Sequence, residues 1–185
     1  MAGPEGVAVD IRPIRRVVTG HDAQGNAVVV MDGPAASVLH RPTRPGVALT
    51  DLWATTDPPS ARVDGDPVDR PVVLHPPRGG TVFRVVQFDP EDPEALAGAD
   101  GVAAFAAMGA AGAVVAGARH PYMHGTDTVD YAVVLAGSIT MVLDDEDVEL
   151  SAGDVVIQNG TSHAWANRGE APCLIAFVLI DAGRR

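Results

Sequence analysis

The chain has 185 residues, the size of one domain or of one domain with an extension. Hydrophobic residues make up 46% of it, which excludes a disordered composition, and aromatic residues make up only 4%, so aliphatic side chains must build the core. With 24 acidic and 13 basic residues the net charge is −11, which argues against nucleic acid or anionic membranes as partners.

The start of the chain predicts no export. The opening residues "MAGPEGVAVDIRP" lack the basic and apolar regions of a secretion signal. Gly101 to Ala118 is uncharged, but Ala and Gly dominate it, so we expect buried structure rather than a membrane span. The single cysteine, Cys173, lies in an apolar run and is expected to be a buried, inert thiol. These features predict a cytoplasmic protein.

The first 80 residues predict strands and an extended arm rather than a separate compact domain. Two short strands are expected within residues 15–33, around a turn at 22–26, and a third within residues 49–57. Residues 57–80 are crowded with Pro, Asp, Gly and Arg, which favours a loop. We assign residues 1–80 to N-terminal strands and a Pro-rich arm that pack on a barrel formed by residues 81–185.

The second half predicts an all-β domain with one helix. Residues 82–88 alternate as in a strand, with the even-numbered residues on one face. Pro93 to Met108 is the helix candidate, although Gly98 and Gly101 weaken it. Further short strands, separated by turn residues, are expected at 112–118, 131–137, 138–144, 148–158, 163–167 and 172–180. Many short antiparallel strands indicate a sandwich or a barrel.

The segment "RHPYMHGTDTVDYAVVLAG", residues 119–137, carries an unusual set of polar side chains. If it is a strand, alternation places six of them on one face: His120, Tyr122, His124, Thr126, Thr128 and Asp130. Such a stripe suits a polar cavity inside a small barrel, and the alternative is an edge strand that faces solvent. In a second segment His163, Trp165 and Asn167 also share a face. Imidazoles from two strands beside a carboxylate can hold a divalent ion.

These two segments resemble the two motifs of the cupin superfamily. In the first motif, His-x-His followed by Glu and Gly, the positions are filled by His124, Thr126, Asp130 and Gly137. In the second, they are filled by Gly153, Gly160, His163 and Asn167. The second motif is one residue short, with Gln158 where Pro is usual. The resemblance covers residues 114–181 and implies a double-stranded β-helix (jelly-roll barrel), here with extra N-terminal strands and one short helix.

Departures from the first motif bear on metal binding. Metal-dependent cupins hold their ion with two His and a Glu of the first motif and the His of the second. Here Thr126 replaces one His and Asp130 is shorter than Glu, so the resemblance does not imply a four-ligand site. His124, Asp130 and His163 can still form a three-ligand site for Fe, Zn, Mn or Ni, with His120 as a substitute ligand; no organic cofactor is expected. Two alternatives stay open: metal-free acid–base chemistry by the same residues, and purely structural polar packing.

The resemblance implies a small-molecule enzyme. Since one His ligand is missing, we expect a lyase, isomerase or dehydratase that moves a proton, assisted by metal or His, on a carbonyl- or carboxylate-bearing, partly hydrophobic substrate. The alternatives are a non-haem iron dioxygenase and a non-catalytic small-ligand-binding cupin. We expect a homodimer and no nucleic-acid or membrane partner. The candidate catalytic residues are His124, Asp130, His163 and Tyr122. The candidate pocket residues are His120, Thr126, Thr128, Trp165 and Asn167.

Overall fold

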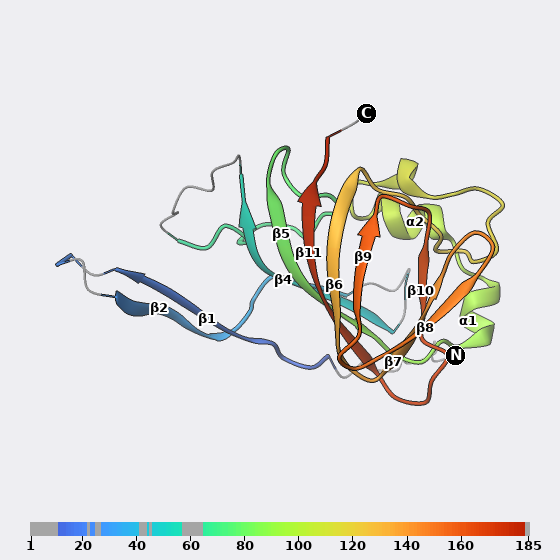
Figure 1. Ribbon diagram of the computed structural model, residues 1–185, viewed down its shortest axis with the longest axis horizontal. Coiled ribbons are helices and arrows are strands. Elements are labelled where there is room, and N and C mark those ends of the chain that lie inside the picture. Colours follow the sequence, from blue (N-terminus) through green and yellow to red (C-terminus); the bar gives the residue numbers. More distant parts are fainter. Residues whose placement is uncertain are drawn as a thin grey trace, which may run out of the picture.

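The structure is a computed structural model that describes residues 11–21, 23–24, 27–40, 44, 46–56 and 65–183 (Figure 1). In chain order its elements are β1 (Arg15–His21), β2 (Ala27–Pro34), β3 (Val38–His40), β4 (Val47–Thr55), β5 (Thr81–Phe88), α1 (Pro93–Ala97), α2 (Gly101–Ala106), the 3-10 turn η1 (Ala111–Ala113), β6 (Thr128–Ala136), β7 (Ser138–Val142), β8 (Asp147–Ser151), β9 (Val155–Asn159), β10 (Ala164–Ala166) and β11 (Cys173–Asp181).

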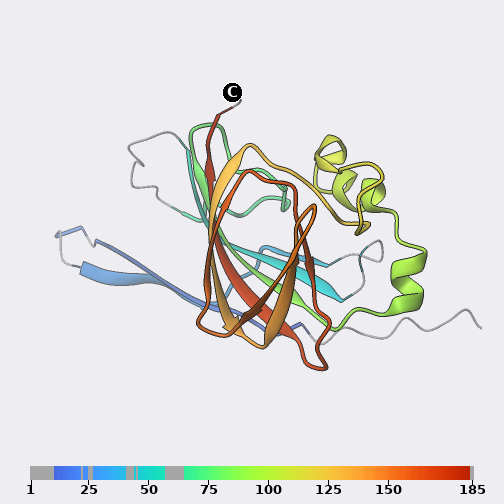
Figure 2. The same cartoon turned by 45° about the vertical axis from the view of Figure 1, so that its right-hand side comes forward.

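Two antiparallel sheets enclose the core. In the described part of the chain, one sheet has the strand order β3-β4-β5-β11-β6-β9 and the other has the order β10-β7-β8. Figure 2 shows these strands curving around a common interior, with the two helices to one side. The predicted all-β jelly-roll barrel is confirmed.

Alternation along the strands decides which side chains fill the barrel. On β5, Val82 is fully buried, whereas its neighbour Phe83 is 40% exposed. The inward residues of β5 and β11 meet those of β7 and β10 in one apolar cluster, which includes Phe88, Ile175 and Trp165. Each side chain of this size contributes about 1.5–3 kcal/mol when fully buried. The hydrophobic effect therefore fixes the face that each strand turns towards the interior.

Two motif glycines stand where a side chain would crowd neighbouring backbone. Gly137 joins β6 to β7 with φ of 75°, and a Cβ there would lie 2.7 Å from the Pro172 carbonyl oxygen. Gly160 has φ of 64°, and its Cβ would lie 3.1 Å from the Thr126 carbonyl oxygen. Both φ values lie in the left-handed region, where glycine carries no steric cost. These turns set the register of the strands that carry the candidate site.

The N-terminal strands are confirmed, and the sheet runs across residue 80. β1 and β2 pair in a hairpin that projects from the barrel (Figure 1). β4 pairs with β5 along its length, so the six-stranded sheet contains strands from both sides of the predicted boundary. The assignment of residues 1–80 as a separate region stays a prediction. The turn expected at 22–26 and the first part of the loop at 57–80 lie largely outside the described residues.

The single helix expected at 93–108 is wrong, because the segment forms two short helices. Gly98 ends α1, and the Asp100 side chain caps α2 by accepting a hydrogen bond from the Ala103 amide at 2.9 Å. The strand expected at 112–118 is also wrong: η1 and turns occupy it, apart from an isolated bridge at Val114. None of the described helices has the length and apolar character needed to cross a membrane.

The polar stripe does not lie on one continuous strand. β6 begins only at Thr128, and the residues before it form turns and an isolated bridge. Gly117, with φ of 70°, and Pro121, which has no amide donor, interrupt strand pairing there. All six polar residues of the stripe are nevertheless buried: His120, Tyr122, His124, Thr126, Thr128 and Asp130. The predicted burial is confirmed, although the expected strand is wrong.

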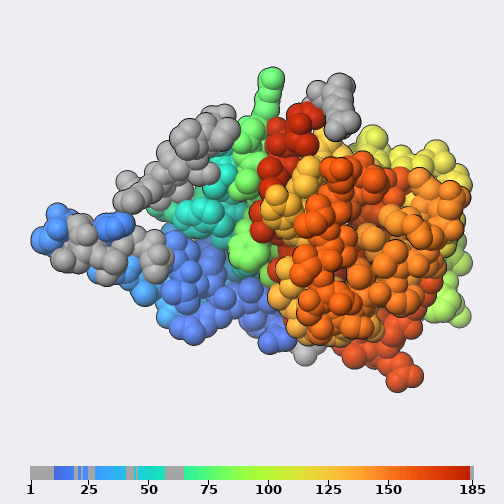
Figure 3. Space-filling model, viewed as in Figure 1, coloured from blue at the N-terminus to red at the C-terminus, as the bar shows by residue number. Residues whose placement is uncertain are grey.

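The outer face of the six-stranded sheet is apolar. Six large side chains of β5, β6 and β9 are between 36% and 63% exposed there: Phe83, Tyr131, Val133, Leu135, Val155 and Ile157. Tyr131 pairs with Ile157 and Val133 with Val155, so the strip continues from strand to strand. Figure 3 shows these strands at the surface, beside the blue hairpin. We call these six side chains the outer apolar strip.

Candidate functional site

A pair of backbone hydrogen bonds brings the two motif histidines together. The amide of His124 donates to the carbonyl of His163 at 2.9 Å, and the amide of His163 donates to the carbonyl of His124 at 3.0 Å. The two imidazole rings lie with their centres 4.5 Å apart, tilted by 44°. His124 precedes β6 of one sheet and His163 precedes β10 of the other. The expected meeting of imidazoles from the two motifs is therefore present.

His124 is held neutral in an apolar environment. Its Nδ1 lies 3.1 Å from the Tyr122 carbonyl oxygen, and only a protonated Nδ1 can make that hydrogen bond. This tautomer leaves Nε2 with a lone pair. The Phe105 ring centre lies 4.5 Å away. Burial first, and then the neighbouring His163, lower the pKa of His124 to about 3, so the ring carries no charge near neutral pH.

His163 can adopt the complementary tautomer. Its Nδ1 lies 2.9 Å from the Gln158 amide nitrogen, a donor, and 3.0 Å from the Thr161 carbonyl oxygen, an acceptor. When Nδ1 accepts from Gln158, the ring proton resides on Nε2. Burial lowers the pKa of His163 below its ordinary value, and the Trp165 ring packs edge-on at 5.7 Å. The two imidazoles can thus present one acceptor and one donor.

Asp130 is a buried carboxylate with an unmet oxygen. It lies on β6 with 5% of its surface exposed, and its Oδ1 is buried without a hydrogen-bond partner. Desolvation raises the pKa of Asp130 to about 6, although the Thr128 side chain and the Arg84 charge lower it. Buried polar atoms without partners are rare and call for a functional or structural explanation. Oδ1 is therefore placed to take a hydrogen bond or a proton from a bound molecule.

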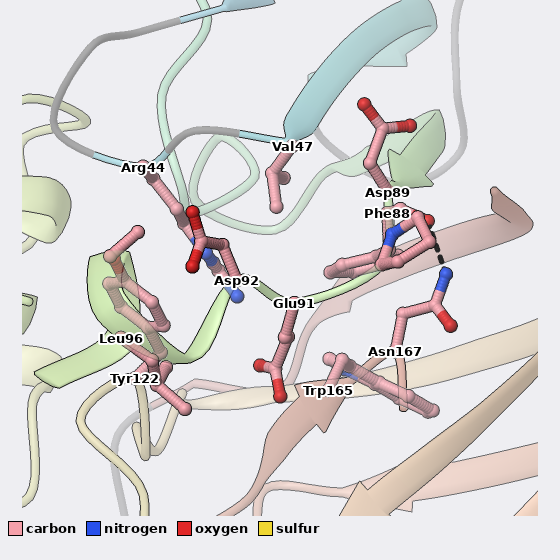
Figure 4. A pocket seen from close by; sticks show the side chains of 12 residues that line it. Arg44, Val47, Phe88, Asp89, Glu91, Asp92, Leu96, Tyr122, Trp165 and Asn167 are labelled. Carbon is pink, nitrogen blue, oxygen red and sulfur yellow. Dashed lines mark hydrogen bonds between the residues drawn. The ribbon is translucent and has the colours of Figure 1, made fainter. Parts of the chain in front are cut away.

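These groups line one cavity, which we call the histidine cavity. Its walls are mostly apolar, and the residues that carry polar or charged groups into them are Arg44, Arg84, His124, Asp130, His163 and Trp165. A neighbouring cavity shares Arg44, Val47, Phe88 and Trp165 with it (Figure 4). Apolar walls around a few convergent polar groups are typical of a small-molecule site.

The remaining predicted residues lie beside this cavity or outside it. Tyr122 and Asn167 line the neighbouring cavity with Trp165 (Figure 4). The Asn167 amide donates to the carbonyls of Phe88 and Ala171 at 2.8 and 2.9 Å, which pins two chain segments together. Burial raises the pKa of Tyr122, so its phenol stays protonated.

Three residues expected in the pocket are buried but belong to neither lining. His120 Nε2 lies 3.0 Å from Glu91 Oε1, and its Nδ1 accepts from the Tyr122 amide at 3.2 Å. The hydroxyls of Thr126 and Thr128 lie 2.7 Å apart and bond to each other. Their polar atoms therefore engage protein partners rather than the cavity.

Two arginines of the site were not foreseen. Alternation groups Arg84 with Val82, Val86 and Phe88 on one face of its strand, but no role follows from that. It is 2% exposed and its Nε donates to Asp51 Oδ1 at 2.6 Å. Arg44 lies in the Pro-containing stretch "RPTRPG", to which the sequence assigned no role. The available signal was an arginine shortly before an apolar stretch, which is too common to single out a site.

The described residues do not assemble the three-ligand metal set. Nowhere in the described ranges do three or more His, Cys, Asp or Glu side chains come close enough to hold one ion. The two imidazoles meet, but the shorter Asp130 carboxylate does not complete the set with them, and Thr126 bonds to Thr128. The donors present do not fit a three-ligand ion, and the predicted divalent metal stays a prediction.

Comparisons with known proteins find a family match over the part of the chain that contains both motifs. The family model described as Cupin domain matches residues 112–180. Phomopsin biosynthesis cluster protein C' of Diaporthe leptostromiformis is 31% identical over 183 residues, covering 94% of this chain and 81% of the relative. Cupin-domain-containing oxidoreductase fogC of Aspergillus ruber is 26% identical over 175 residues, covering 90% of this chain and 71% of the relative.

Similarity to solved structures is weaker. The polyketide cyclase RemF from Streptomyces resistomycificus has a TM-score of 0.43 and 17% identity, over 79% of this chain and 72% of that one. A putative ethanolamine utilization protein from Salmonella typhimurium has a TM-score of 0.43 and 14% identity, over 93% and 99% of the two chains. Values this low say nothing about activity.

The environment of Asp130 predicts a pH-dependent stability change on mutation. The pKa of Asp130 is about 6 in the folded state and about 3.9 in the unfolded state, so the folded protein holds this proton more tightly. The free energy of unfolding therefore falls as the pH rises from about 3.9 through about 6. Asp130→Asn in chelator-treated protein should therefore raise the free energy of unfolding at pH 8 by roughly 1–3 kcal/mol and change it little at pH 4. Urea denaturation at both pH values measures this, with the exposed Asp145→Asn as control. A loss of stability at pH 8 would contradict the assignment.

Proposed function

Because this chain belongs to the cupin superfamily, we propose that it is a small-molecule enzyme that moves a proton at the carbon next to a substrate carbonyl. The reaction class is a lyase, isomerase or dehydratase. Relatives named as cupin-domain oxidoreductases and biosynthesis cluster proteins support a biosynthetic role at this coarser level. The observation that carries the proposal is the buried, unpartnered Oδ1 of Asp130 in the histidine cavity.

Asp130 is the proposed base. A carboxylate with a pKa of about 6 is ionised at neutral pH, yet it accepts a proton far more readily than an exposed aspartate. It would take the proton from the α-carbon, leaving an enolate, and would itself become a neutral carboxylic acid. Returning the proton to another carbon completes an isomerisation. Delivering it to a departing hydroxide releases water and completes a dehydration.

The two imidazoles complement the base. In the tautomer in which Nδ1 accepts from Gln158, His163 can donate a hydrogen bond from Nε2 to the enolate oxygen. His124 offers the Nε2 lone pair as an acceptor, because its Nδ1 proton is engaged with the Tyr122 carbonyl. Since burial lowers the pKa of His124 to about 3, we do not assign it the role of a charged electrophile. The apolar walls of the histidine cavity favour a substrate with a hydrophobic body.

An oxidoreductase is the second candidate. The names of relatives that are 24–26% identical to this chain favour it. Oxidoreduction needs an electron acceptor or donor, and a metal ion is the group that the superfamily implies. A bound ion would act as a Lewis acid or redox centre, and the residues nearest to holding it are His124 and His163. A non-catalytic ligand-binding cupin remains the third alternative.

Hydrogen exchange at carbon tests the proton-transfer proposal without knowledge of the substrate. We would incubate the protein in D₂O with a panel of aryl-alkyl ketones, aldehydes and keto acids, and follow loss of α-C–H signals by proton NMR. Wild type should catalyse exchange in at least one compound. Asp130→Asn should slow that exchange by about 10²–10⁴-fold, and His163→Gln by about 10-fold or more.

The same spectra separate the candidate functions. Asp145 is an exposed carboxylate between β7 and β8, so the control variant Asp145→Asn should catalyse exchange at the wild-type rate. Exchange that survives unchanged in Asp130→Asn would overturn the role of the base. A change in the oxidation level of a compound, with stoichiometric metal in the same sample by elemental analysis, would favour the oxidoreductase.

We also propose that the protein is a cytoplasmic homodimer, and the outer apolar strip is the surface that supports this proposal. Contiguous exposed apolar area of this kind is typical of protein interfaces. Light scattering coupled to size exclusion should give the mass of a dimer for wild type. Ile157→Asp with Val155→Asp should give a monomer, and the exposed helix variant Val102→Asp should stay dimeric. A monomeric wild type would contradict the proposal.

A further inference from the structure

Arg44 lies where the histidine cavity and the neighbouring cavity meet, and it lines both. Its guanidinium carbon lies 4.3 Å from the centre of the Tyr122 ring, and 5.8 and 5.9 Å from those of Phe88 and Phe105. In Figure 4 Arg44 and Tyr122 lie on one side of the neighbouring cavity, with Trp165 and Asn167 on the other. Stacking on aromatic faces orders the guanidinium and leaves the donors at its edge for another group.

The guanidinium of Arg44 has no anionic partner among the described residues. Its Nε is buried without a hydrogen-bond partner, and no described carboxylate lies within 4.0 Å of it. Arg84, the other arginine of the histidine cavity, differs in this respect. It donates to Asp51 at 2.6 Å and to the carbonyls of Val73 and Leu74 at 2.6 and 3.4 Å. Arg44 is therefore the cavity arginine with a buried donor, Nε, that has no partner among the described residues.

The carboxylates that line the neighbouring cavity already have other partners. Glu91 Oε1 lies 3.0 Å from His120 Nε2. Asp92 Oδ1 accepts from the Glu94 amide at 2.9 Å and caps α1, and Asp89 Oδ1 accepts from the Gln87 amide group at 2.9 Å. These acidic groups nevertheless leave negative charge nearby, so a doubly charged ligand would be repelled more strongly than a singly charged one.

The chemistry of the ligand follows from these constraints. A planar guanidinium matches a carboxylate through two parallel hydrogen bonds, and partial burial strengthens them. A phosphate would carry a second negative charge towards Glu91 and Asp130, whereas a monocarboxylate would not. Desolvation lowers the pKa of Arg44 to about 10, so the charge persists at neutral pH.

We propose that Arg44 binds the carboxylate of a monoanionic substrate and directs the rest of that substrate into the histidine cavity. The Phe105 ring links the two places, because its centre lies 5.9 Å from the Arg44 guanidinium carbon and 4.5 Å from the His124 ring centre. The proposal rests on the proposed function in taking this cavity as the substrate site. It adds a substrate class, hydrophobic monocarboxylates, and a binding residue.

Titration calorimetry with matched probes tests the proposal. The probes are hydrocinnamate, its neutral carboxamide and phenyl phosphate, which share a phenyl body and differ in charge. Wild type should bind hydrocinnamate at least about tenfold more tightly than the amide and more tightly than phenyl phosphate. Arg44→Met should remove the preference for the acid. Arg44→Lys keeps the positive charge but loses the two parallel N–H donors of the guanidinium, so it should retain part of the preference for the acid. The exposed Arg78→Met should bind as wild type does.

Four results would each overturn the carboxylate-binding proposal. They are equal binding of acid and amide by wild type, no binding of hydrocinnamate, tighter binding of phenyl phosphate, and an unchanged preference in Arg44→Met. The comparison of acid with amide needs only wild type, so it stands even where Arg44→Met does not fold. Selective binding of the acid without α-carbon exchange in any compound would refute the proposed function and leave the carboxylate site in place.

Discussion

The reciprocal backbone hydrogen bonds between His124 and His163 hold the candidate site together. They connect the segment before β6, in the six-stranded sheet, with the segment before β10, in the three-stranded sheet. A bridge between facing sheets leaves little freedom for the two side chains, because the backbone of each residue is fixed by the other. The imidazoles must therefore lie side by side in the histidine cavity. The Gly160 turn, close to the Thr126 carbonyl, brings the two segments within reach.

The apolar walls of the histidine cavity then shift the pKa values of the titratable groups that line it. Low polarity disfavours charge, which lowers the pKa of His124 to about 3 and raises that of Asp130 to about 6. Arg44 keeps its charge because guanidinium is so strongly basic. The cavity thus holds neutral imidazoles, a carboxylate that is easily protonated and a fixed cation. Such a set suits the proposed anion binding and the proposed proton transfer, and it costs stability that a purely structural cluster would not require.

The sequence was sufficient for the barrel and for the imidazole pair, for identifiable physical reasons. Gly137 and Gly160 have positive φ values and lie close to neighbouring backbone, which favours glycine, so their spacing from the histidines indicated the register. Alternation predicted which polar residues are buried, although the backbone before Thr128 is not a strand. Burial by turns and burial by a strand leave the same polar pattern, so the pattern alone could not distinguish them.

The role of Arg44 was missed because it depends on contacts between distant segments. Arg44 stacks on Tyr122, Phe88 and Phe105, which are far from it along the chain and from one another. Motif spacing also does not say whether ligand side chains converge on one point, and in the described residues no three His, Cys, Asp or Glu side chains do. The break between α1 and α2 depends on a local choice, in which the Asp100 cap competes with helix propagation across Gly98.

The central claim is that Asp130 is a buried carboxylate without a protein partner for one of its oxygens. The most direct test is a carbon-13 NMR titration of the Asp130 side-chain carboxyl in chelator-treated protein, assigned by comparison with Asp130→Asn. We expect a midpoint of about 6, because desolvation raises the pKa of this carboxyl. A midpoint at or below the ordinary aspartate value of about 3.9 would show a solvated or paired carboxylate and would contradict it.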